Sequence, residues 1–354
     1  MKKSAVFSIA ILGVILLVCG YTHPATVLAQ TSTPAAAEPI VLKYASTMPT
    51  ISPLSKTNVK WAERIEQQSG GRLKIKTYFS EALAKQVNTF RAVQDGVADI
   101  AFYILGWNPG LLPLNEITRL PFMGIPSQKA ATSIQWALYN KFPELQKEFS
   151  GLKVIQITGT PPDQFHFTKK EVRVPADIKG MKLLAGGRWP EVMKNLGAVA
   201  LDQGVGEWYM SLERGLAEGH ITHFVVIKSV RTLELFKFHT LFGDPGCSIM
   251  IMPYLMNPDS WKKLTPDLQK ILEDACKWQE EEILKPDEVD IQAALKFAQD
   301  NNHKITNLTA EEIQQWVDAA KPVHEKWIAE NSAKGPARAI YDEAKRLISE
   351  YTKR

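Results

Sequence analysis

The sequence has 354 residues, of which 45% are hydrophobic, with 42 basic and 38 acidic side chains. This length exceeds the roughly 250–300 residues that one hydrophobic core supports, so we expect two lobes. The near balance of charge excludes the strongly basic surface that nucleic-acid binding requires, and we predict no nucleic-acid partner.

The first forty residues have the pattern of an exported protein. Two lysines precede an apolar run at residues 5–18, which is too short to span a bilayer comfortably, and residues 27–29, Val-Leu-Ala, form a small-residue cleavage site. We predict that residues 1–29 are a cleaved signal peptide, that residues 30–39 are a disordered leader, and that the mature protein is periplasmic without a membrane span of its own. An uncleaved anchor and acylation of Cys19 as a lipoprotein are the alternatives.

Strands and helices alternate in the first half of the mature chain. Apolar and polar residues alternate at 73–78, whereas 100–105 is continuously apolar, which is typical of a strand covered on both faces. Apolar residues at helical spacing separate these runs. The predicted strands are residues 41–45, 73–78, 100–105 and 154–157, with helices near residues 59–65, 87–97 and 127–142.

The first lobe ends near Pro161-Pro162, because two prolines cannot extend a central strand. Strands of a second lobe are predicted at residues 181–184, 198–201 and 221–226, before the chain returns through 240–242 and 248–252. We therefore predict an α/β protein in which residues 40–160 form lobe I with part of 247–354, and residues 161–246 form lobe II with part of the C-terminal helices.

The last third of the chain has helical spacing. Apolar residues recur every three or four positions from Trp261 to Trp278, within a predicted long helical stretch at residues 258–285. Further helices are predicted near residues 287–301, 310–331 and 337–351.

Catalytic motifs are absent from the sequence. There is no Gly-x-Ser-x-Gly, His-Glu-x-x-His or Cys-x-x-Cys, and the glycines near residue 204 lack the rest of a phosphate-binding loop. We predict no cofactor and no enzymatic activity, with an exported hydrolase or lyase as the alternative. His220 and His223 could bind a metal only from one helical face, but they fall at a helix-to-strand junction, so we predict no metal site. Cys247 and Cys276 are predicted as buried thiols, with a disulfide as the alternative.

Aromatic residues gather where loops should leave strand ends. Trp107, Phe165, Trp189 and Phe224 all follow or flank predicted strands. Ligands of open α/β sheets bind outside the carboxyl ends of the strands. We therefore predict a pocket between the lobes.

Five segments together resemble the DctP-like solute-binding proteins of tripartite ATP-independent periplasmic (TRAP) transporters. They are Lys43–Ser46, Gly71–Ile75, Phe90–Asp99, Leu120–Phe122 and the block from Gly180 to Gly219. The resemblance implies a two-lobed periplasmic-binding-protein-like fold with hinge strands, and a long helix packed across both lobes, for which residues 258–285 are the candidate. It also implies capture of a small organic solute, commonly an acid, and its delivery to a TRAP permease.

The chain departs from the family at two ligand contacts. The usual arginine falls at Leu184 and the usual asparagine at Thr222. We predict that Arg188 meets the carboxylate of an acid with an apolar or aromatic body. The alternatives are that Arg188 is a solvated turn residue, that the solute is neutral or cationic, and that the closed protein signals to a sensor kinase. The predicted ligand-binding residues are Trp107, Phe165, His166, Leu184, Arg188, Thr222 and Phe224.

Overall fold

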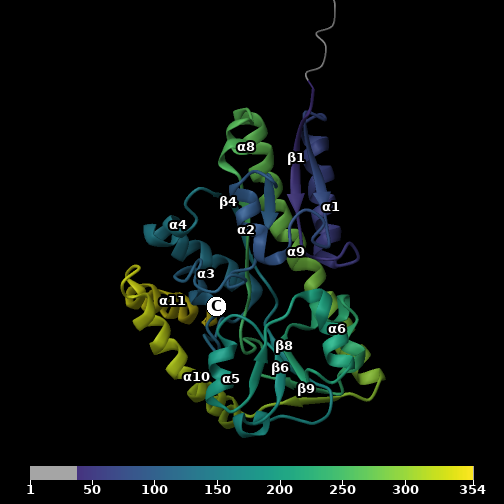
Figure 1. The fold of residues 1–354 in the computed structure, drawn as a ribbon, viewed down its shortest axis with the longest axis vertical. Coiled ribbons are helices and arrows are strands. Elements are labelled where there is room, and N and C mark those ends of the chain that lie inside the picture. The colour runs from purple at the N-terminus through teal and green to yellow at the C-terminus, as the bar shows by residue number, and fades with distance from the viewer. Residues whose placement is uncertain (1–37, 354) are drawn as a thin grey trace, which may run out of the picture. The chain divides into compact units, whose positions relative to one another are not determined.

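The computed structural model describes residues 38–353, except the side chains at 286–288. The predicted signal peptide, Cys19 and the predicted leader up to residue 37 lie outside the described residues. Two mixed β-sheets with helices packed against them form the described chain (Figure 1). The predicted α/β class and two-lobed fold are confirmed.

The first sheet has five strands in the order β2-β1-β3-β10-β4. All pairs are parallel except those that β10 makes with β3 and β4, because β10 enters from the other sheet. Helices α1, α2 and α3 pack against β2, β3 and β4. The bounds are β1 Ile40–Ala45, α1 Pro53–Gln68, β2 Leu73–Tyr78, α2 Thr89–Gln94, β3 Ile100–Phe102, α3 Gln128–Lys141, α4 Pro143–Glu148, β4 Lys153–Gly159 and β10 Ile251–Met256.

The second sheet has six strands in the order β11-β9-β5-β8-β6-β7. Here β5, which enters from the first sheet, is the antiparallel strand between β9 and β8. The bounds are β5 Gln164–Phe167, β6 Lys182–Leu184, α5 Trp189–Asn195, β7 Val199–Leu201, α6 Val205–Glu213, β8 Gly219–Thr222, α7 Phe224–Ser229, β9 Phe238–Leu241 and β11 Lys304–Asn307. Short 3-10 segments lie at Gln86–Asn88, Asn115–Arg119, Pro175–Ile178 and Thr232–Leu235.

Two crossing segments join the sheets, at residues 159–164 and 246–251. They run antiparallel to one another: the amide of Thr160 donates to the carbonyl of Met250 at 2.9 Å, and Asp163 donates to the carbonyl of Ser248 at 2.8 Å. Paired backbones of this kind keep their hydrogen bonds while a few dihedral angles change, which is how hinge strands serve two-lobed proteins. The predicted hinge strands are therefore present.

The long helix is α9, Pro266–Asp300, which follows a short helix α8, Pro258–Lys262. It contacts α1 and β4 of the first sheet and α7 and β11 of the second (Figure 1). The predicted bounds of 258–285 are wrong, because the helix begins later and continues through position 286, where we expected a break. We expected the break because proline disfavours a helix interior by roughly 3 kcal/mol.

Helix α10, Ala310–Asn331, also spans both cores, and α11, Ala337–Thr352, packs beside it. The indole of Trp316 packs against Phe165 of the second sheet, with ring centroids 5.0 Å apart. Trp327 lies instead in the core under the first sheet. Within residues 38–353, no helix has the length and apolar character needed to cross a membrane.

Two further sequence predictions have clear outcomes. The predicted strand at 221–226 is wrong beyond Thr222, because Phe224–Ser229 form helix α7, whose first turn is capped by the side chain of His223. Its β-branched residues favour a strand, but burial of the short helix against α9 overrides that preference. Cys247 and Cys276 are free and buried, as predicted, so no disulfide joins them.

Candidate functional site

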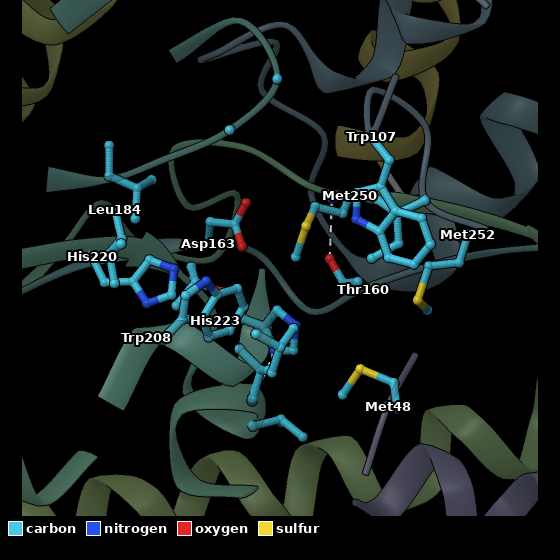
Figure 2. Close-up of a pocket in the computed structure, with 18 of the residues that line it drawn as sticks. Met48, Trp107, Thr160, Asp163, Leu184, Trp208, His220, His223, Met250 and Met252 are labelled. Atoms are coloured by element: carbon cyan, nitrogen blue, oxygen red, sulfur yellow. Dashed lines mark hydrogen bonds between the residues drawn. The ribbon is translucent and has the colours of Figure 1, made fainter. Parts of the chain in front are cut away.

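A pocket lies between the two sheets, beside the crossing segments, and holds about 150 Å³. Its wall comes from the loops after β1 and β3, from the crossing segments, and from β6, β8 and α7 of the second sheet. Figure 2 shows His220, Trp208 and His223 on one side of the view, Trp107, Met250 and Met252 on the other, and Asp163 and Thr160 between them.

Most of the wall is apolar. Three methionines and three tryptophans supply large, polarisable side chains that adapt to a flat guest, and Leu184 extends this surface from β6. The indole of Trp208 stands edge-on to the imidazole of His220, with centroids 4.5 Å apart. The apolar lining includes Met48, Trp107, Leu184, Trp189, Trp208, Met250 and Met252.

Arg119 is the only arginine or lysine among the residues that line this pocket. It ends the 3-10 segment Asn115–Arg119, and its guanidinium donates to the carbonyl of Leu105. The guanidinium lies against the backbone of two loops: a Cβ added at Gly187 would stand 3.0 Å from Nη2, and one at Gly106 would collide with Nη1. Both glycines have positive φ angles, which favour glycine, and a side chain at either position would also meet the guanidinium.

The charge of Arg119 has no ion-pair partner within the described part of the chain. Burial lowers its pKa, and the nearest acids, Glu116, Asp163 and Asp202, raise it only in part. A guanidinium has five N–H donors in a planar fork, and a single carbonyl occupies one of them. Arg119 therefore has free donors at the cavity, and the acids near it act on its charge only from beyond ion-pair distance.

Asp163 is an acid of unusual character in this wall. Its Oδ2 accepts a hydrogen bond from the Ser248 hydroxyl at 2.8 Å, whereas Oδ1 is buried without a partner. Burial raises the pKa of Asp163 to about 7, although the Ser248 hydrogen bond and the charge of Arg119 act in the opposite direction. The carboxyl group is therefore close to half protonated at neutral pH.

Strand β8 brings His220 and Thr222 to the pocket, and the residue that follows it, His223, adds a third polar side chain. Burial lowers the pKa of each histidine to about 3, so both rings are neutral at physiological pH. Nδ1 of His223 accepts from the amide of Val226, and a neutral ring then carries its proton on Nε2. Nδ1 of His220 and the hydroxyl of Thr222 are buried and unpartnered.

The structure brings some of the predicted ligand-binding residues together and not others. Trp107, Leu184 and Thr222 line the pocket. Phe165, His166 and Phe224 are buried behind it and contribute no lining surface. His166 donates or accepts only within the core, to the Thr222 carbonyl at 3.1 Å and to His239 at 2.8 Å.

Arg188 is not among the residues that line the pocket, and its side chain is mostly buried, so it is not a solvated turn residue either. Its guanidinium pairs with Glu191 at 2.7 Å, Glu330 at 3.0 Å and Glu116 at 3.6 Å. These acids lie on three separate segments, so Arg188 has enough negative charge around it without a ligand. Arg119 is the better placed cation for an anionic guest.

Several lining residues escaped the sequence analysis. Arg119 directly precedes Leu120-Pro121-Phe122, a segment that the resemblance had already singled out, so its position carried a usable signal. For His220 and His223 the sequence suggested ordinary surface or hydrogen-bonded histidines, with a metal site as the alternative, and not contact with a solute. No cluster of metal-ligating side chains occurs within residues 38–353. Asp163 had no sequence signal beyond its place after the two prolines.

Comparison with known proteins identifies what the chain is similar to. Residues 44–331 match the family described as bacterial extracellular solute-binding protein, family 7. A solute-binding protein of Verminephrobacter eiseniae is 25% identical over 221 residues, which cover 61% of this chain and 64% of that protein. The chain spans 40%, 64% and 59% of the lengths of three curated relatives.

Two solved structures are similar over nearly their whole length. A TRAP solute-binding protein from Rhodoferax ferrireducens, in complex with copurified benzoate, is 25% identical with a TM-score of 0.80, and the match covers 89% of this chain and 99% of that one. A marine metagenome TRAP solute-binding protein specific for aromatic acid ligands, in complex with 3-hydroxybenzoate, is 25% identical with a TM-score of 0.81 over the same shares.

Proposed function

Because the chain belongs to family 7 of the bacterial extracellular solute-binding proteins, the DctP-like receptors of TRAP transporters, we propose that it captures a small carboxylic acid with an apolar or aromatic body. The family consists of extracytoplasmic transport proteins that work with a membrane permease, and not of enzymes. We propose that residues 1–29 are removed on export, that lobes 40–160 and 161–246 close on the acid, and that the closed form delivers it to a TRAP permease.

The unpaired charge of Arg119 carries this proposal. A desolvated cation is unfavourable unless an anion compensates it, and the described residues supply none within ion-pair distance. A carboxylate matches the planar fork of a guanidinium with two parallel hydrogen bonds. The solute carboxylate is thus the group that completes the site. Arg119 binds this carboxylate in place of the arginine that the family usually has at the position of Leu184.

The size and lining of the cavity support one ring as the body of the acid. Apolar cavities of about 150 Å³ in proteins hold a guest the size of benzene, and this pocket has the same volume. Leu184 is 1% exposed and offers methyl groups where an arginine would offer charge. The two solved relatives at 25% identity, which hold benzoate and 3-hydroxybenzoate, support the same class of solute.

Titration calorimetry with benzoate tests the proposal. Replacing Arg119→Met removes the charge while keeping most of the side-chain length, and should weaken binding by about 10- to 150-fold, the equivalent of about 1.5–3 kcal/mol for hydrogen bonds to a charged group. The matched control is Arg91→Met on α2, whose guanidinium is exposed and pairs with Asp95; it should bind as the parent does. Equal affinity of the Arg119→Met variant and the parent would contradict the proposal.

A further inference from the structure

The pocket has a second polar region that the carboxylate and its arginine leave unexplained. His220 and Thr222 are two residues apart on β8, so their side chains project from the same face of the strand. They are 4% and 2% exposed. Both line the cavity, and Nδ1 of His220 and Oγ1 of Thr222 have no hydrogen-bond partner.

Groups that are buried without partners in a folded protein need an explanation, because nearly all buried polar side-chain atoms are hydrogen-bonded. Here two such atoms lie on one face of one strand and at one cavity. The ring of His220 contacts Trp208 edge-on, an arrangement that fixes the imidazole plane without satisfying its nitrogens. The pair therefore forms a preset hydrogen-bonding position rather than an isolated packing defect.

The chemistry of this position matches an uncharged polar group. A neutral imidazole has one donor and one acceptor nitrogen, and a hydroxyl both donates and accepts. Arg119 is the sole arginine or lysine of the lining, so a second carboxylate would enter this region without a cation to compensate it. A hydroxyl or carbonyl group could satisfy both side chains at no charge cost.

Resting on the proposed function, we infer that the solute carries a hydroxyl or carbonyl group besides its carboxylate, and that His220 and Thr222 recognise it. His220 and Thr222 then determine which acid binds best, whereas Arg119 binds the carboxylate that all these acids share. A site that hydrogen-bonds a substituent discriminates strongly against the analogue without it, because the buried partners are left unpaired.

The test compares benzoate, its three hydroxy isomers and terephthalate by titration calorimetry on the mature protein. At least one hydroxybenzoate should bind about tenfold or more tightly than benzoate, and terephthalate should bind more weakly than that isomer. The Thr222→Val variant keeps the shape of the side chain and removes its hydroxyl. In this variant the ratio of the affinity for the best hydroxybenzoate to the affinity for benzoate should fall toward one. Thr77→Val, on β2 and outside the pocket lining, should keep the parental ratio.

The outcomes separate this inference from the function on which it rests. Benzoate binding as tightly as every hydroxy isomer, tightest binding of terephthalate, or an unchanged ratio in Thr222→Val would each overturn the role of His220 and Thr222 while leaving an acid-binding protein. Failure of all five acids to bind would overturn the proposed function itself. His220→Phe, which keeps an aromatic ring against Trp208, gives a second variant in which the ratio should also fall.

Discussion

The affinity for an acid should depend on pH through Asp163. Burial holds the pKa of this carboxyl group at about 7, and Asp163 lines the cavity with its Oδ1 buried and without a hydrogen-bond partner. A carboxylate that binds at Arg119 adds negative charge to the same wall and raises the pKa of Asp163 further. Binding of the solute therefore favours the protonated form of Asp163. When Asp163 is ionised before binding, the complex takes up a proton from solution.

The sign and size of the effect follow directly. At pH 8, one unit above a pKa of about 7, protonating Asp163 costs about 1.4 kcal/mol, which corresponds to a tenfold loss of affinity. At pH 6 the group is already mostly protonated and the cost nearly vanishes. We expect the affinity for the best acid to fall about tenfold between pH 6 and pH 8.

The perturbation is Asp163→Asn, which mimics the neutral acid and keeps an oxygen for the Ser248 hydroxyl. This variant should bind with an affinity independent of pH, and about tenfold more tightly than the parent at pH 8. Calorimetry in two buffers of different ionisation enthalpy counts the protons taken up, close to one for the parent at pH 8 and none for the variant. Asp95→Asn, on the surface of α2, is the control and should keep the parental slope. If the affinity of the parent did not depend on pH, or if the affinity of Asp163→Asn changed with pH as steeply as that of the parent, Asp163 would not be the group that takes up the proton.

Two further predictions concern the buried histidines. The folded state keeps neutral three rings whose pKa values burial lowers to about 3, those of His220, His223 and His239. The unfolded chain protonates them below about pH 6.5, so stability is lost as pH falls, by about 2 kcal/mol per ring at pH 5. Burial also lowers the pKa of His166 well below its usual value, which adds to the loss, whereas the raised pKa of Asp163 acts with the opposite sign and offsets only part of it. Urea unfolding should thus give a free energy at least about 3 kcal/mol lower at pH 5 than at pH 7, and equal values would contradict this. The second prediction concerns the chain of hydrogen bonds from the carbonyl of Thr222 through His166 and His239 to His303. The carbonyl can only accept, which fixes the proton on Nε2 of His166 and on Nδ1 of the other two rings; nitrogen NMR that found another tautomer in any of the three would disprove the order.

Much of the framework follows from local pattern. The alternation at residues 73–78 and the apolar run at 100–105 predicted the strands β2 and β3, because both signals are local, although β3 ends at Phe102, three residues earlier than predicted. The strand predicted after Thr222 was wrong, because the valines and isoleucine of this segment favour a strand. The capping role of the His223 side chain cannot be recognised from composition.

The candidate site was harder to predict, because its charges are set by partners distant in sequence. Arg188 lies only four residues from Leu184, and this proximity suggested a substitute for the family arginine. The turn at Gly187 and the acids Glu116 and Glu330, far away along the chain, hold its guanidinium elsewhere. Arg119 differs from Arg188 in this respect, because folding places no described carboxylate within ion-pair distance of its guanidinium. Its charge is therefore available to a solute.

Diffraction from crystals grown with the tightest-binding acid locates the solute and its carboxylate. We expect one acid inside the cavity between the sheets, with both carboxylate oxygens at about 2.7–2.9 Å from guanidinium nitrogens of Arg119. A carboxylate bound at Arg188 or outside this cavity, with Arg119 still unpaired, would contradict it.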